Sequence, residues 1–150
     1  MTFFSFFRKK FFTKAQESAV VKAIREAEAN TSGEIRVHLA DRIHTDVMND
    51  AALCFSKLKM DNTERRNGVL IFIVPSARQF AIIGDQGFHA IAGDDFWQHE
   101  KQIIGSYFEK GQFAEGLVEG IAAVGALLKK HFPREANDIN ELDDEISYGK

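Results

Sequence analysis

The residues with the clearest chemical potential lie between Gly84 and Trp97, in a stretch that combines three carboxylates with three glycines. The carboxylates belong to Asp85, Asp94 and Asp95, and the stretch follows an apolar segment that is typical of a β-strand. Loops that follow strands often carry binding and catalytic residues. Crowded carboxylates repel one another and need protons, a basic side chain or a cation. Because the group is rich in oxygen and contains no Cys, it predicts a site for calcium or magnesium.

Each of these acids also has a purely structural interpretation. Asp85 can make a turn, and Asp94 or Asp95 can cap a helix expected over about 95–109. His89 lies in the same stretch and can act as an acid or base near neutral pH, although an exposed surface position is the simpler interpretation. The residue pattern alone leaves both interpretations open.

Size and composition favour one soluble globular domain. The chain has 150 residues, of which 45% are hydrophobic and 27% are charged, values that are ordinary for such a domain. The formal net charge of -3 gives no indication of nucleic-acid binding. The single cysteine, Cys54, excludes an intrachain disulfide and a Cys-based zinc site, and its apolar neighbours predict a core position. No apolar run reaches the roughly 20 residues of a membrane span, and no signal peptide is recognisable, so we expect a cytoplasmic protein.

The sequence lacks the common signatures of covalent and nucleotide-dependent catalysis. It contains no GxSxG elbow, no P-loop, no GxGxxG after a strand and no HExxH pair. Nor does Asp85-Gln86-Gly87 fit an EF-hand loop, which needs acids at alternate positions and a distant Glu. A hydrolase built on this sequence would therefore have to use a water activated by a metal ion.

Hydrophobic periodicity predicts the order helix, strand, helix, strand, strand, helix, helix. The first helix should begin after Thr13, which can form a capping box with Gln16. The expected helices span about 13–29, 45–59, 95–109 and 113–131, and the expected strands span 34–39, 69–74 and 79–83. The middle strand is apolar throughout and should be buried on both faces, which requires helices on both sides. The predicted fold class is therefore α/β, as a three-layer α/β/α sandwich with a small mixed central sheet.

The two ends of the chain differ from its body. We divide it into an N-terminal segment, 1–12, an α/β domain, 13–132, and a tail, 133–150. The first segment holds six of the 14 Phe residues and three basic residues. It is expected to pack on the domain with Phe4, Phe7 and Phe11 facing inward, although a basic aromatic segment can also lie on a membrane surface. The tail is acidic and poor in large apolar residues, so it is expected to be disordered.

Four short motifs, in this order, give the chain a resemblance to a known family. They are Ser32-Gly33-Glu34-Ile35, Asn67-Gly68-Val69-Leu70-Ile71, Gly84-Asp85-Gln86-Gly87 and Phe113-Ala114-Glu115-Gly116-Leu117. Together they resemble the TPM domain family, as a soluble bacterial member, over about 15–132. That family is also described as a thylakoid-lumen acid phosphatase domain related to photosystem II repair proteins. The resemblance implies an α/β/α sandwich with a divalent cation, often calcium, in the loops at one edge of the sheet.

Carried onto this sequence, the resemblance implies a metal site made by Asp85, Asp94 and Asp95, with Glu34 and Asn67 nearby. Without the resemblance, Glu34 would be interpreted as a solvent-facing strand residue and Asn67 as part of a solvated loop. The chain departs from many members because it has neither a recognisable signal nor a membrane span, and because its acidic stretch contains His89-Ala90-Ile91 in place of a Leu-rich turn.

The resulting hypothesis is a cytoplasmic TPM-type domain that binds calcium or magnesium. If it is an enzyme, it should be a slow metal-dependent phosphatase, a hydrolase of phosphomonoesters, with Asp85 and Arg66 as candidate catalytic residues. Arg66 can hold a phosphate group. The alternative is a non-catalytic module whose loops are ordered by the metal and which contacts a protein partner or a membrane surface through its N-terminal segment. In a third interpretation the acids are helix caps only.

Overall fold

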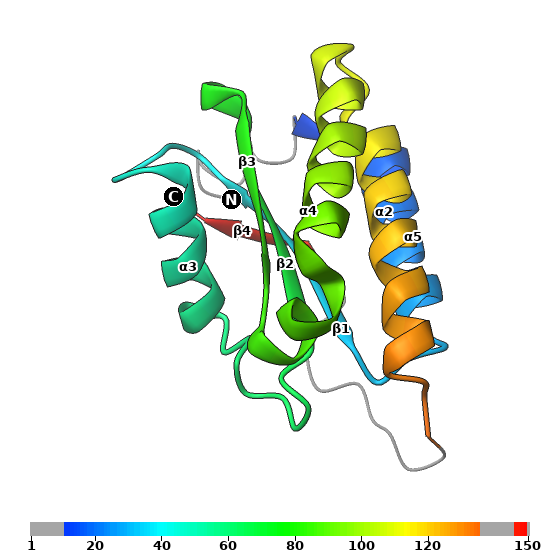
Figure 1. Cartoon of the computed structure of the whole chain (residues 1–150). Coiled ribbons are helices and arrows are strands. Elements are labelled where there is room, and N and C mark those ends of the chain that lie inside the picture. The colour runs from blue at the N-terminus through cyan, green and yellow to red at the C-terminus, as the bar shows by residue number, and fades with distance from the viewer. Residues whose placement is uncertain (1–10, 136–145, 150) are drawn as a thin grey trace.

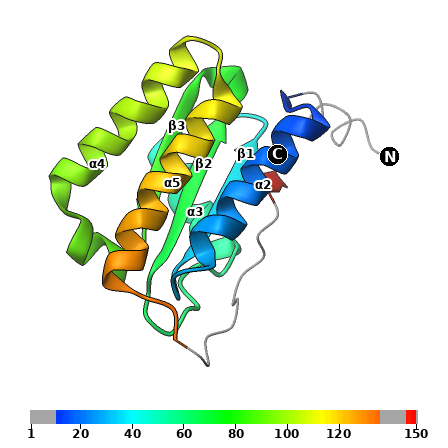
Figure 2. The same ribbon diagram turned by 90° about the vertical axis from the view of Figure 1, so that its right-hand side faces the viewer.

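The computed structural model describes residues 11–135 and 146–149. Its elements are α2 (Lys14–Glu28), β1 (Glu34–Ala40), α3 (Val47–Lys57), β2 (Gly68–Val74), the 3-10 helix η1 (Pro75–Ala77), β3 (Gln79–Gly84), α4 (Gln86–Glu109), α5 (Phe113–His131) and β4 (Ser147–Gly149). The helix α3 covers one face of the sheet, and α2, α4 and α5 cover the other (Figure 1). Figure 2 shows these three helices side by side across their face. The predicted α/β/α sandwich is therefore confirmed.

The sheet has the strand order β3-β2-β1-β4. The strand β1 is parallel to β2 and to β4, whereas β3 is antiparallel to β2, so the sheet is mixed, as predicted. Glu34 pairs with Gly68, and Val69 pairs with Gly84. The starts of β1 and β2 and the end of β3 therefore meet at one end of the sheet, which we call the amino end. The opposite end, where β1, β2 and β4 finish, is the carboxyl end.

Alternation along β1 and β2 divides the core into two layers. Ile35, Val37 and Leu39 are buried in a cluster with α2, α4 and α5. In β2, Leu70, Phe72 and Val74 instead join a second cluster with residues of α3, among them the buried Cys54. All seven residues of β2 are buried, which confirms the prediction that this strand is covered on both faces.

The stretch after β3 is the main difference from the sequence prediction. The helix α4 begins at Gln86 rather than near residue 95, so the expected acidic loop is largely helical. Gly93 interrupts the helical geometry with φ 75° and ψ 165°, and the helix continues beyond this kink to Glu109. Gly87 and Gly93 suggested a loop, but the first allows a close backbone approach and the second forms the kink.

The two ends of the chain are partly described. Phe12 is buried, and Phe11 lies against Phe113 with ring centroids 5.0 Å apart, whereas Phe4 and Phe7 lie outside the described residues. The expectation of a disordered tail is wrong for 146–149, because Ser147–Gly149 form β4 and Ile146 joins the core; 136–145 lie outside the described residues. No helix within 11–135 or 146–149 is long and apolar enough to cross a membrane. The cytoplasmic location stays a prediction.

Candidate functional site at the amino end of the sheet

Asp85 lies at the amino end of the sheet and forms the N-cap of α4. Its backbone N–H donates to the carbonyl of Gly68 at 2.8 Å, which ties it to the start of β2. Its carboxylate is buried and accepts the backbone N–H of Gln86 at 2.8 Å. Arg66 donates to both carboxylate oxygens, from Nε at 2.6 Å and from Nη2 at 2.9 Å. The predicted ligand Asp85 is therefore both a helix cap and one half of a bidentate ion pair.

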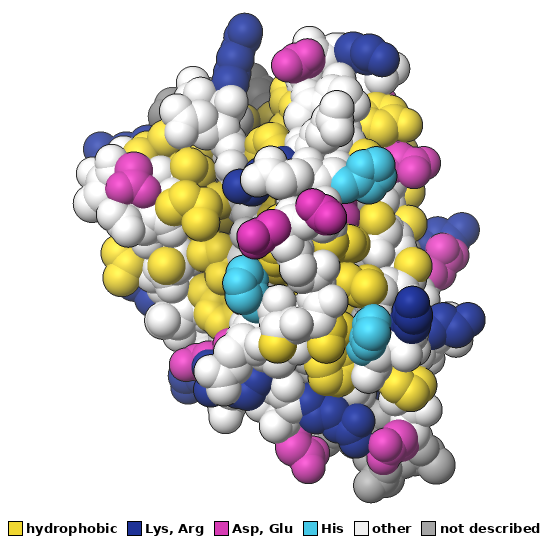
Figure 3. Space-filling model, viewed as in Figure 1, with side chains coloured by type: hydrophobic (Ala, Val, Ile, Leu, Met, Phe, Trp, Pro, Cys, Tyr) yellow, Lys and Arg dark blue, Asp and Glu magenta, His cyan; other side chains and the backbone are white. Residues whose placement is uncertain are grey.

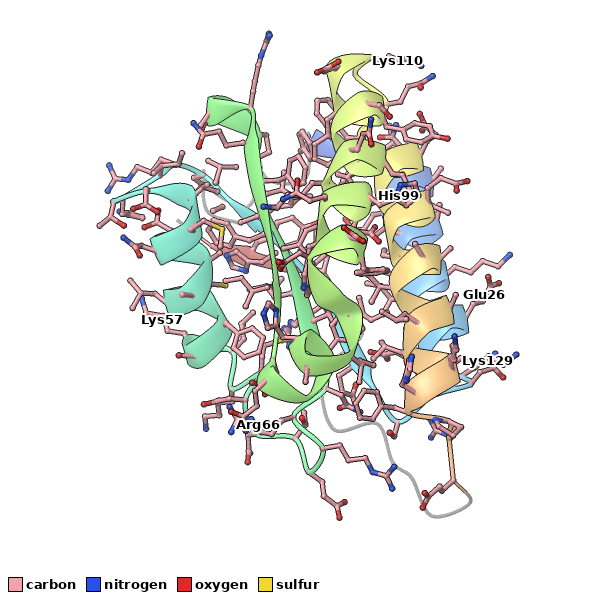
Figure 4. The ribbon with its side chains drawn as sticks, viewed as in Figure 1. Glu26, Lys57, Arg66, His99, Lys110 and Lys129 are labelled. Carbon is pink, nitrogen blue, oxygen red and sulfur yellow. The ribbon has the colours of Figure 1, made fainter. Side chains whose placement is uncertain are left out.

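The loop that carries Arg66 is packed tightly against the first turn of α4. Arg66 has a left-handed backbone with φ 52°, and its carbonyl accepts the N–H of Gly87 at 2.8 Å. A Cβ atom on Gly87 would lie 2.3 Å from the carbonyl oxygen of Arg65. The hydrogen bonds to Asp85 raise the pKa of Arg66. Figure 4 shows Arg66 in the loop beneath the start of α4.

Glu34 and Asn67 lie at the same end of the sheet, and both are buried, with 2% and 1% of their surface exposed. The N–H of Glu34 faces the carbonyl of Asn67 at 3.5 Å. The side-chain amide of Asn67 donates to Ser32 Oγ at 3.3 Å, but its Oδ1 is buried without a hydrogen-bond partner among the described residues. Neither residue is therefore the solvated residue that the alternative interpretation expected.

Asp94 and Asp95 are exposed and follow the kink at Gly93, so they lie in the first turn of the second part of α4. Carboxylates in such a first turn interact favourably with the helix dipole. Asp94 also lines a hollow of about 500 Å³ between α3 and α4, beside β3. His89 lines the same hollow, where its ring stacks on Trp97 with centroids 6.0 Å apart.

The structure thus brings Glu34, Asn67 and Asp85 to one end of the sheet and leaves Asp94 and Asp95 on α4 beyond its kink. In the part of the chain that is described, no three His, Cys, Asp or Glu side chains are close enough to hold a metal ion. Acidic side chains are spread over the face shown in Figure 3. The chemistry of the donors at the amino end still suits a hard cation, since they are oxygens and one of them, Asn67 Oδ1, has no hydrogen-bond partner in the described part of the chain.

Sequence analysis missed Glu100, which is 1% exposed on α4. Neither of its carboxylate oxygens has a hydrogen-bond partner among the described residues, and burial raises its pKa to about 7. A Cβ atom on Gly120 of α5 would lie 2.8 Å from Glu100 Oε1. The available signal was its spacing, three residues after Trp97 and four before Ile104, on the buried face of the helix.

Comparison with known proteins gives a consistent result. The sequence model described as the TPM domain matches residues 7–127. The fold is similar to the NMR structure of the BA42 protein from the psychrophilic bacterium Bizionia argentinensis, with a TM-score of 0.87 and 47% identity over 93% of this chain and 96% of that chain. It is also similar to the N-terminal domain of a protein from P. gingivalis, with a TM-score of 0.63 and 23% identity over 81% of this chain and 79% of the other. The N-terminal domain of the cg2496 protein from Corynebacterium glutamicum has a TM-score of 0.65 and 12% identity, over 87% and 81% of the two chains. No curated protein matches.

Proposed function

Because the chain belongs to the TPM domain family, we propose that it binds a divalent cation, with calcium as the first candidate and magnesium as the second. The observation that carries the proposal is the buried amide oxygen of Asn67, which has no hydrogen-bond partner among the described residues. A buried acceptor of this kind costs free energy unless something satisfies it. A hard cation would do so, and the carboxylates of Glu34 and Asp85 at the same end of the sheet would add charge.

Arg66 competes with the cation in this proposal. Its guanidinium already neutralises Asp85 through two hydrogen bonds, so a cation that uses Asp85 must displace it or share the carboxylate. Side-chain exposure makes such a displacement feasible, because 41% of the Arg66 side chain is exposed whereas only 6% of the Asp85 side chain is. Affinity should therefore rise when Arg66 is neutralised and fall when an oxygen ligand is removed.

The test is a titration of ¹⁵N-labelled protein with calcium chloride and, separately, with magnesium chloride. Amide shifts should be centred on 32–34, 66–68 and 84–87. Arg66→Gln should bind calcium more tightly, and Asn67→Ala more weakly, than the unchanged protein. The variants Asp94→Asn and Asp95→Asn test the remaining predicted ligands. Shifts centred on 93–98 that vanish in these two variants would move the site to α4, and no shift at millimolar metal would end the proposal.

Phosphomonoester hydrolysis is the catalytic form of the same proposal. A bound cation would polarise a phosphoryl oxygen and acidify a water. Arg66 can help to hold a phosphate only if it leaves Asp85 or shares its donors, so catalysis should be slow. The assay is hydrolysis of an aryl phosphate by highly purified protein, with and without chelator, beside Asp85→Asn. Activity that survives both chelator and substitution would belong to another site or to a contaminant.

The second candidate is an interaction module that acts through the N-terminal segment. Its supporting observation is the packing of Phe11 and Phe12 on the domain. These two residues end the Phe-rich basic segment and attach it to the domain beside Phe113. The full chain should sediment with vesicles that contain anionic lipid, and a chain that begins at Phe11 should not. If neither chain sediments with vesicles, the segment does not bind anionic membranes. A protein partner then remains as the alternative, and it is tested with the same two chains.

A further inference from the structure

A second hollow lies at the opposite, carboxyl end of the sheet. It has a volume of about 480 Å³ and lies between α3 and the ends of β1 and β4. Figure 1 shows α3 over its face of the sheet, with β4 behind β2 and β3 in this view. Open α/β sheets bind ligands beyond the carboxyl ends of their parallel strands, and β1, β2 and β4 are parallel. The volume also falls in the range of small-molecule pockets.

The floor of this carboxyl-end pocket is a stacked pair of aromatic rings. His38 and Phe72 are register partners on β1 and β2, and their rings are parallel within 9° with centroids 5.5 Å apart. His38 Nδ1 lies 2.7 Å from Ser147 Oγ, which in turn can donate to the carbonyl of Val37. A Cβ atom on Gly149 would lie 2.6 Å from His38 Nε2, so glycine lets β4 close over the ring. The orientation of the floor is therefore fixed.

The wall on the α3 side is apolar. It includes Leu53, Cys54 and Leu58. Burial raises the pKa of the Cys54 thiol to about 11, so this wall carries no thiolate charge at neutral pH. Leu53 is 57% exposed, and among the described residues it and Met48 are the large hydrophobic residues with the greatest exposure. A ligand in the pocket would cover part of this apolar surface.

The lining of the pocket also contains two basic residues. Arg42 and Lys57 both line it, and neither forms an ion pair with another described residue. Figure 4 shows Lys57 at the end of α3. The acid that lines the pocket, Asp50, is committed to the adjoining loop: its carboxylate accepts the N–H of His44 at 2.6 Å and both the N–H and the hydroxyl of Thr45. Asp50 therefore fixes the adjoining loop, and it forms no ion pair with Arg42 or Lys57 among the described residues.

We propose that the carboxyl-end pocket binds a small organic anion with a flat apolar body, of the class of aromatic carboxylates and aryl phosphates. The body packs against the stacked rings of His38 and Phe72 and against the wall of α3. Arg42 and Lys57 supply charge-assisted hydrogen bonds to the anionic group from the pocket lining. This site is separate from the proposed cation site, because the two lie at opposite ends of the same strands.

The first experiment titrates ¹⁵N-labelled full-length protein, free of added divalent metal, with phenyl phosphate. Benzyl alcohol is the neutral aromatic comparison, and inorganic phosphate is the comparison without a ring. Phenyl phosphate should shift the amides of 38–44, 53–58 and 147–149 and bind at least about tenfold more tightly than either comparison. Equal binding of benzyl alcohol or of inorganic phosphate would overturn the proposal, as would the absence of binding at millimolar probe.

The second experiment uses variants. The double variant Arg42→Gln with Lys57→Gln should weaken phenyl phosphate binding at least about tenfold and leave the binding of benzyl alcohol unchanged. Lys101→Gln is the matched control, because Lys101 lines the hollow between α3 and α4. Leu53→Ser should weaken binding without altering the preference for the anion. Shifts that centre on Trp97, or a Lys101→Gln effect as large as that of the double variant, would place the probe in the other hollow and overturn the assignment.

Discussion

At the amino end of the sheet Asp85 and Arg66 neutralise each other through two hydrogen bonds, whereas at the carboxyl end Arg42 and Lys57 have no acidic partner among the described residues. The first pair fastens a loop to a helix. Arg42 and Lys57 instead line an apolar hollow and form no ion pair within the described part of the chain. The charged side chains that form a structural ion pair and those that line a hollow without one therefore lie in different places along the strands.

The buried carboxylates that hold backbone groups make the same point. Glu28 accepts the N–H of Ile35 at 2.7 Å, Asp50 accepts the N–H of His44, and Asp85 accepts that of Gln86. Each satisfies a backbone donor at a junction between a loop and a helix or strand. Acidic residues in this sequence are therefore, in several places, parts of the backbone scaffold, and their frequency near glycines does not by itself mark a metal site.

The largest expected effect is that of Gly87→Ala at the amino end. The new Cβ would lie 2.3 Å and 2.7 Å from the carbonyl oxygens of Arg65 and Arg66, so the loop must move away from α4. We expect a loss of about 3 kcal/mol or more in the free energy of unfolding, measured by urea denaturation. Gly105→Ala in the same helix is the control: its nearest neighbour is Phe80 Cε1 at 4.0 Å, so it should stabilise by about 0.5–1 kcal/mol. Equal effects would show that the loop is not packed as described.

Asp85→Ala and Asp46→Ala compare a helix cap that also carries an ion pair with a cap alone. Asp46 is exposed and accepts the N–H of Asn49 at 2.9 Å at the start of α3. Its loss should cost about 0.5–2 kcal/mol. The loss of Asp85 should cost about 2–4 kcal/mol, because the hydrogen bonds of Arg66 go with the cap. If urea denaturation gives the same value for both, the pairing of Arg66 adds nothing and the contrast between the two ends weakens.

Glu100 is the reference for a buried carboxyl that has no described partner. Its pKa rises from 4.5 to about 7 on folding, so the folded protein binds the proton more tightly than the unfolded one. Stability should therefore fall as pH rises through this range, by about 3 kcal/mol, and then level off. Glu100→Gln should remove this decline, so the variant should match the unchanged protein at pH 4 and exceed it at pH 8. Urea midpoints across pH test this, with the exposed Glu109→Gln as the control; a decline that persists in Glu100→Gln would contradict the assignment.

Ser147→Ala should give the smallest effect and tests the floor of the carboxyl-end pocket. It removes the 2.7 Å contact with His38 Nδ1 and should cost about 0.5–1.5 kcal/mol. The ¹⁵N shifts of the imidazole should also change, since Nδ1 loses its hydrogen-bond partner. Ser106→Ala is the control, because this exposed hydroxyl donates only to the carbonyl of Ile103 within its own helix. Unchanged imidazole shifts in Ser147→Ala would show that β4 does not orient the ring.

Local patterns predicted much of the fold. The capping box of Thr13 and Gln16 is present, and Asp46 caps α3, because both depend on contacts within one turn. The alternating residues of β1 and the apolar run of β2 became strands within a residue of the expected bounds. The order of these elements was sufficient to predict the layers, since β2 needs cover on both faces.

Features that depend on distant contacts could not be predicted in this way. The helix α4 begins with Gln86 and Gly87, and glycine has a low helix propensity. The first turn is stabilised by a hydrogen bond from the N–H of Gly87 to the carbonyl of Arg66, which lies 21 positions earlier in the sequence. The pairing of Arg66 with Asp85 likewise joins residues that are 19 positions apart. The strand β4 is only three residues long, so it shows no periodicity of its own. The basic lining of the carboxyl-end pocket had one sequence signal, Arg42 soon after the end of a parallel strand.

The pairing of β4 with β1 also has a consequence for synthesis of the chain. His38 and Ser147 are in contact but are 109 positions apart in sequence. A ribosome releases the chain from its N-terminus, so β1 and β2 can pair while the residues of β4 are still being added. Until Gly149 has emerged, the ring of His38 lacks the neighbour that closes over it. The carboxyl-end pocket is therefore completed only after β4 has been synthesised, and a nascent chain that stops short of 147 would present the domain without this side of the pocket.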